Sequence, residues 1–110
     1  MTSSPSMKSY MIITAVLHDR EAFLSGYARA TGPLVAKHGG RYVMLAPGGT
    51  LLEGAWGDGA SIVISEWPDR AAIQSFWDSP EYGEAKKLRE GVADVQVMVV
   101  DAPQFTKEPS

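Results

Sequence analysis

Short apolar runs rich in β-branched residues recur along the chain and predict four strands. They occupy residues 8–17, 40–46, 61–67 and 94–100. Turn-forming residues follow each of the first three runs, as expected where strands end. After the Pro47-Gly48-Gly49 turn, Leu51-Leu52-Glu53-Gly54 resembles a short continuation of the second strand or an edge piece.

Helical spacing of apolar residues dominates the segment between the first two strands. One stripe there consists of Phe23, Tyr27, Ala30 and Leu34. It predicts a helix over residues 20–38, with Asp19 as its N-cap and Gly39 after its end. Gly32-Pro33 is expected to kink or split this helix, because proline lacks a backbone N–H group.

Two further helices are predicted between the third and fourth strands. Asp69 caps the first, and Ser79-Pro80 begins the second, which is expected to continue to Val92. The resulting order, β-α-β-β-α-β, is typical of the ferredoxin-like fold. We therefore expect one α+β domain over residues 8–102, with a four-stranded antiparallel sheet and flexible tails at 1–7 and 103–110.

Both faces of the predicted sheet are apolar, which points to a partner. In the first strand, Ile12 and Val16 fall on one face, and Met11, Ile13 and Leu17 on the other. Helices cover only one of these faces, and each large apolar side chain left in water costs about 1.5–3 kcal/mol. The simplest cover is an identical sheet, so we expect a homodimer.

Composition excludes several classes of function. The net charge of −3 and the lack of a clustered basic surface argue against nucleic-acid binding. The absence of Cys excludes thiolate chemistry and suits a cytoplasmic protein, and no apolar run is long enough to span a membrane. The only two histidines, His18 and His38, lie on different segments, so no metal or other cofactor is expected.

Two residues are candidates for general acid–base chemistry. His38 ends the first helix and can point into a cavity, although a side chain at a helix C-terminus can also simply interact with the helix dipole. Glu66 lies late in the third strand, where a half-buried carboxylate can act as a base. The alternative for Glu66 is an ion pair with an arginine.

An aromatic wall with one guanidinium group is the most suggestive ligand-binding pattern. Its members are Tyr27, His38, Arg41, Trp77, Tyr82 and Arg89. On one continuous helix, Tyr82 and Arg89 share a face, which suits a small carboxylate or another anion. Arg89 otherwise needs an internal acceptor such as Glu53 or Glu66, which we expect in the resting state. The alternative is that these aromatic residues belong to the core.

Several motifs together resemble a known family. They are Tyr27, His38-Gly39-Gly40-Arg41-Tyr42, Leu52-Glu53-Gly54, Ile64-Ser65-Glu66-Trp67-Pro68-Asp69, Phe76-Trp77-Asp78-Ser79-Pro80-Glu81-Tyr82 and Arg89. Over about residues 8–101 the chain resembles the domain of unknown function 1330 (DUF1330) family, with Trp67 and Trp77 as small departures. The resemblance implies a ferredoxin-like protomer of the dimeric α+β barrel superfamily, and a family without an established reaction.

The resemblance leaves three hypotheses for the function. The first is a binder or enzyme for a small carboxylate-bearing or aromatic molecule, held between helices and sheet. The second is a non-catalytic dimeric interaction module. The third, implied by the superfamily, is a cofactor-independent monooxygenase-like or isomerase-like enzyme. The chain contains no Asn, which disfavours haem-degrading relatives that use that residue.

Overall fold

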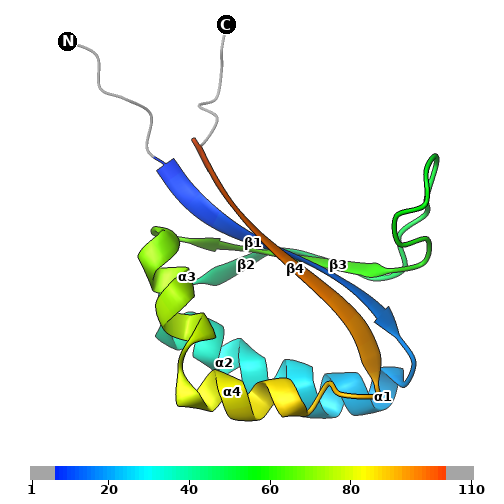
Figure 1. Ribbon diagram of the computed structural model, residues 1–110, viewed down its shortest axis with the longest axis horizontal. Coiled ribbons are helices and arrows are strands. Elements are labelled where there is room, and N and C mark those ends of the chain that lie inside the picture. The colour runs from blue at the N-terminus through cyan, green and yellow to red at the C-terminus, as the bar shows by residue number, and fades with distance from the viewer. Residues whose placement is uncertain (1–6, 104–110) are drawn as a thin grey trace, which may run out of the picture.

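The β-branched runs form a single antiparallel sheet in the computed structural model, which describes residues 7–103. Its strands are β1 (Met7–Leu17), β2 (Arg41–Ala46), β3 (Ser61–Trp67) and β4 (Ala93–Pro103). They lie in the order β2-β3-β1-β4, and helices cover one face (Figure 1). The expected ferredoxin-like α+β fold is confirmed.

The first and last strands of the chain extend slightly beyond the expected domain limits. Met7 and Pro103 were expected in the tails, but they pair with each other at the ends of β1 and β4. The other expected tail residues, 1–6 and 104–110, lie outside the described part of the chain.

The first helical stretch runs through α1 (Arg20–Ala22), a π-helical segment η1 (Phe23–Ala28) and α2 (Arg29–Lys37). Asp19 caps it by accepting a hydrogen bond of 3.0 Å from the Ala22 N–H group. The expected split at Gly32-Pro33 is wrong, because α2 continues through Pro33. Burial of Thr31 and Val35 on either side holds the helix despite the missing donor.

The second helical region is shorter than predicted. It contains α3 (Arg70–Trp77), capped by Asp69, and α4 (Pro80–Lys87), capped by Ser79. The chain then turns toward β4, and Gly91 adopts a positive φ of 79° that ends the helical path. The prediction of a helix to Val92 is therefore wrong, and Arg89 lies in the turn after α4.

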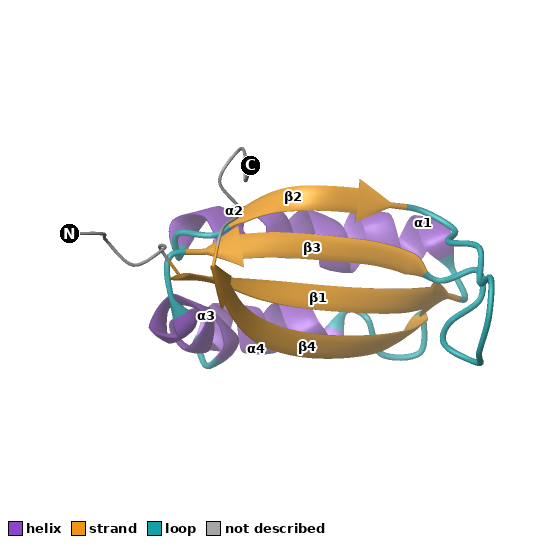
Figure 2. Ribbon diagram, turned by 90° about the horizontal axis from the view of Figure 1, so that it is seen from above, coloured by secondary structure: helices purple, strands orange, loops and turns teal. Residues whose placement is uncertain are grey.

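Strand register separates the two faces of the sheet. Ile13 lies opposite Val63 and Val97 on the face that packs against the helices. Ile12 lies opposite Ile64 and Met98 on the other face, which no helix covers and which we call the open face (Figure 2). The apolar character of both faces, expected from the sequence, is therefore present in the structure.

A long loop, residues 47–60, joins β2 to β3 and projects beyond the sheet (Figure 1). The backbone N–H of Leu51 donates to Asp58 Oδ1 over 3.0 Å, and that of Gly49 donates to the Ala60 carbonyl over 2.8 Å. The edge strand expected at residues 51–54 is absent from this loop. Gly48 and Gly54 have positive φ angles of 59° and 98°, which strands do not accommodate.

No helix within residues 7–103 combines the length and apolar character needed to cross a membrane.

Candidate functional site

An apolar cavity of about 330 Å³ lies between the helix-covered face of the sheet and the first helical stretch. Met11 and Ile13 line it from β1, Val63 lines it from β3, and Phe23 and Tyr27 line it from η1. This volume falls within the range of small-molecule pockets, which are mostly apolar with a few polar groups. The cavity can therefore enclose an organic molecule of one or two rings.

Thr31 supplies the unusual polar group of this cavity. Its side chain is only 6% exposed, and its Oγ1 has no hydrogen-bond partner within residues 7–103. A buried hydroxyl without a partner costs about 1–3 kcal/mol. Such groups are rare in folded proteins, so this hydroxyl marks the point where a bound molecule can place a polar atom.

Tyr27, which lines the cavity, is paired with a second buried tyrosine, Tyr82. The hydroxyl oxygens of Tyr27 and Tyr82 are 2.7 Å apart, and the two rings meet edge to face. Burial, the neighbouring Tyr27 and their hydrogen bond raise the pKa of Tyr82, while the charge of Arg89 opposes the change. Tyr82 therefore remains protonated at neutral pH. The expected proximity of Tyr27 and Tyr82 is present in the structure.

The Arg89 guanidinium lies beside this pair, with its central carbon 5.4 Å from the centroid of the Tyr27 ring. The side chain is partly buried, and within the described residues it forms no ion pair with a carboxylate. The internal partner expected for Arg89 is thus not found. Trp77 is also near the pair, with its ring 5.2 Å from that of Tyr82 and the Lys86 ammonium 4.4 Å above it.

His38, Arg41 and Glu66 lie away from the cavity. His38 ends α2, where its Nδ1–H donates to the Leu34 carbonyl over 3.0 Å. Arg41 and Glu66 lie directly opposite each other on the open face, where the Arg41 Nε–H donates to Glu66 over 3.0 Å. Tyr10 also donates to Glu66 over 3.0 Å. The structure thus divides the predicted site residues between the two faces of the sheet.

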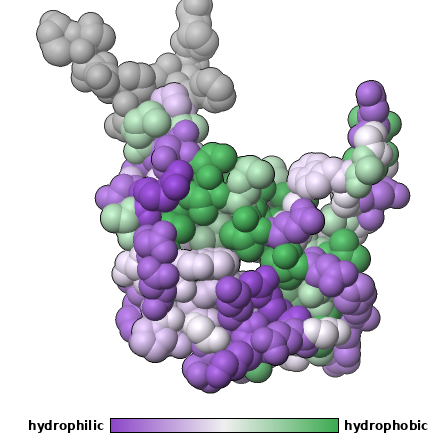
Figure 3. Space-filling view, viewed as in Figure 1, coloured by the Kyte–Doolittle hydropathy of each residue, from purple (hydrophilic) through white to green (hydrophobic). Residues whose placement is uncertain are grey.

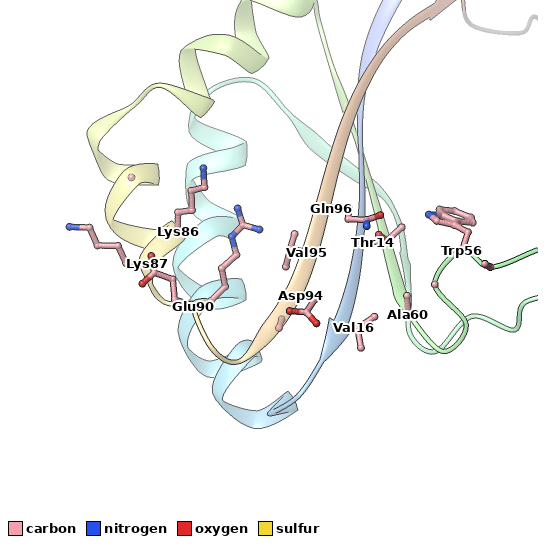
Figure 4. A pocket seen from close by; sticks show the side chains of 15 residues that line it. Thr14, Val16, Trp56, Ala60, Lys86, Lys87, Glu90, Asp94, Val95 and Gln96 are labelled. Carbon is pink, nitrogen blue, oxygen red and sulfur yellow. The ribbon is translucent and has the colours of Figure 1, made fainter.

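A second hollow, of about 740 Å³, opens between α4, β4 and the 47–60 loop. Lys86, Lys87 and Glu90 line it on one side of β4, and Trp56 lies on the other (Figure 4). In the space-filling view, hydrophobic residues gather on the sheet side of this region and hydrophilic residues on the helix side (Figure 3). The hollow is wide and open, so it suits a charged group better than an apolar body.

Thr31 is the main residue that sequence reasoning missed. It lies one turn after Tyr27 in the helical stretch, so the available signal was a polar residue beside the apolar stripe. Within residues 7–103, no group of three His, Asp or Glu side chains could hold a metal ion.

Comparison with known proteins places the chain in a family and a fold. The family described as "Domain of unknown function (DUF1330)" matches residues 8–103. The search of curated proteins gave no match.

Three solved structures share the fold at low sequence identity. A protein of unknown function from Rhodopseudomonas palustris, RPA0582, has a TM-score of 0.76 and 22% identity over 91% of this chain and 85% of its own. SnoaB, a cofactor-independent oxygenase from Streptomyces nogalater, has a TM-score of 0.66 and 20% identity over 92% and 98%. A putative antibiotic biosynthesis monooxygenase from Nitrosomonas europaea has a TM-score of 0.64 and 12% identity over 99% and 100%.

Proposed function

The chain belongs to the DUF1330 family, and from the geometry of its cavity we propose that it binds a small, largely apolar molecule with one polar group. The observation that carries the proposal is the buried Thr31 hydroxyl, which faces an apolar cavity and has no partner within residues 7–103. A ligand oxygen that accepts from this hydroxyl removes the cost of leaving it unpaired. The fold is shared with a cofactor-independent oxygenase and a putative antibiotic biosynthesis monooxygenase, which supports the proposal of an organic ligand.

The chemistry of the lining sets the ligand class. Aliphatic side chains of the sheet and the Phe23 and Tyr27 rings of η1 offer apolar contact, which favours a flat, mostly hydrocarbon body. Thr31 recognises one hydroxyl or carbonyl group on that body. A bicyclic aromatic alcohol has this combination of features, and naphthol is a convenient probe for it.

The test compares naphthol with naphthalene, which lacks the polar atom. We expect the wild type to bind naphthol about tenfold more tightly, as a single hydrogen bond to a buried partner allows. Thr31→Val keeps the shape but removes the hydroxyl, so it should abolish this preference. Thr14→Val is the matched control, because Thr14 is also buried but does not line the cavity. Equal affinity of the wild type for both probes, or no binding of either, would contradict the proposal.

We also propose that the open face packs against a second copy of the chain. Its apolar side chains include Ile12, Ile64, Met44 and Met98. Met44 and Met98 are 45% and 62% exposed in the single chain, although both lie within a largely apolar face. The projecting 47–60 loop carries Leu52 and Trp56, both exposed, and can extend the contact. An identical sheet would bury these apolar side chains in one self-complementary interface.

A further inference from the structure

Arg89 is a partly buried cation that lies against an aromatic ring. Its guanidinium lies 5.4 Å from the centre of the Tyr27 ring, and no carboxylate within residues 7–103 forms an ion pair with it. A guanidinium group presents five donors in a planar fork that matches a carboxylate. Arg89 also lines the open second hollow, where its donors can reach a ligand, so the arrangement suits an anionic acceptor.

The tyrosine pair adds a neutral donor at the same place. Each of Tyr27 and Tyr82 carries one hydroxyl proton, and the 2.7 Å bond between them uses only one of the two. The remaining proton is available to an acceptor. Because the pKa of Tyr82 is raised by burial, this hydroxyl keeps its proton and donates rather than repelling an anion.

Neighbouring charges do not neutralise Arg89 by direct pairing. Lys86 is close to the same aromatic cluster but lies over the Trp77 ring, 4.4 Å from its centre. The acidic side chains that line the second hollow are Glu90 and Asp94. The Asp94 carboxylate accepts a hydrogen bond of 3.0 Å from His18 Nε2. Within residues 7–103, therefore, no carboxylate neutralises Arg89 by an ion pair.

Tyr27 connects the two features, because it lines the apolar cavity and also contacts Arg89, which itself lines the second hollow. We infer that Arg89 and the Tyr27–Tyr82 pair form a subsite for the carboxylate of an aromatic or alicyclic acid whose apolar body occupies the cavity. This inference rests on the proposed function, and it gives the ligand a carboxylate in addition to the polar group that Thr31 can bind. The carboxylate accepts from the guanidinium and from the free tyrosine hydroxyl, both of which are charge-assisted hydrogen bonds.

The test compares naphthoate with naphthamide, which has the same shape without the charge. We expect the wild type to bind naphthoate about 10-fold to 100-fold more tightly, as expected for hydrogen bonds to a charged group. Arg89→Gln should remove this preference by weakening naphthoate binding alone. Arg89→Lys should restore part of it, because it returns the charge without the fork. Lys87→Gln is the charge-matched control, since Lys87 pairs with Glu84 on the surface, and it should keep the preference.

The outcomes separate this inference from the proposed function. If naphthamide and naphthoate bind the wild type equally, or if Arg89→Gln keeps the preference while its circular dichroism remains native, the carboxylate subsite is overturned and the cavity proposal stands. If neither compound binds the wild type, both fail. If Lys87→Gln loses the preference as fully as Arg89→Gln, the effect is general electrostatics and the subsite is again overturned.

Discussion

The hydroxyl groups of Tyr27 and Tyr82 meet at 2.7 Å, although the residues are 55 positions apart in the sequence. This bond joins η1 to α4 inside the helical layer. Both side chains are buried, so the bond satisfies two polar groups that have lost contact with water. Tyr27 also lines the cavity and contacts Arg89, so the bond links the packing of the helices to the proposed site.

Removing both tyrosine hydroxyls together should cost less stability than the sum of the two single removals. Tyr82→Phe leaves the Tyr27 hydroxyl buried without its partner, which we expect to lower the free energy of unfolding by about 1–3 kcal/mol. Tyr27→Phe should have a similar effect. The double variant leaves no orphaned hydroxyl, so its loss should be smaller than the sum of the single losses. Urea unfolding of the four proteins measures the coupling, and strictly additive losses would mean that the bond contributes nothing.

Stability should decline at alkaline pH. Burial raises the pKa of Tyr42 and Tyr82 in the folded protein, whereas unfolded tyrosines have a pKa of about 10. The unfolded state thus loses these protons first, and their contribution to stability is complete below pH of about 10 and lost as the pH rises further. Above a pH of about 10, the free energy of unfolding should fall less steeply with pH in Tyr82→Phe than in the wild type. The difference in slope should correspond to about one proton. An identical slope in the two proteins would contradict this account of Tyr82.

Much of the fold follows from local pattern, but the site depends on tertiary contacts. Alternation and helical spacing predict the four strands and the buried position of Tyr27. The end of α4 was mispredicted because the turn at Gly91 and the entry into β4 decide it. That error placed Arg89 on a helix face. In the structure Arg89 lies in the turn after α4, and from there it contacts Tyr27.

The division of the candidate residues between two faces could not be read from the sequence either. Arg41 and Glu66 pair because the register of β2 against β3 sets them opposite each other, and alternation alone does not fix a register. Thr31 was overlooked because a threonine near an apolar stripe usually bonds to the preceding helical turn. Only the packed structure reveals that this hydroxyl has no such partner among the described residues.

Glycine at position 40 should be far less replaceable than glycine at position 32. A Cβ atom on Gly40 would lie 2.7 Å from the Trp67 indole, which is only 1% exposed and has no room to move. We expect Gly40→Ala to lower the free energy of unfolding by about 1–3 kcal/mol, as overpacking does. Gly32→Ala meets nothing within 4 Å inside α2 and should stabilise the protein slightly. Thermal unfolding of both variants checks the contrast, and equal effects would refute the close approach.

A charge on the open face should disrupt the proposed dimer without unfolding the protomer. Met98→Lys places an ammonium on that face, opposite Ile12, where a second sheet would bury it at high cost. Leu24→Lys is the matched control, because Leu24 is 46% exposed on the helical side. In sedimentation at micromolar concentration, the wild type and Leu24→Lys should be dimeric and Met98→Lys monomeric with native circular dichroism. A wild type that sediments as a monomer would contradict the dimer.

The affinity of naphthol for a cavity-filling variant tests the central claim most directly. Ala28→Leu adds apolar volume to the cavity from η1, whereas Ala36→Leu makes the same change at an exposed position of α2. The account predicts that titration calorimetry gives the wild type and Ala36→Leu the same dissociation constant, and that Ala28→Leu binds at least about tenfold more weakly. Equal affinity of all three proteins for naphthol would place the molecule elsewhere, and it would contradict the cavity as the ligand site.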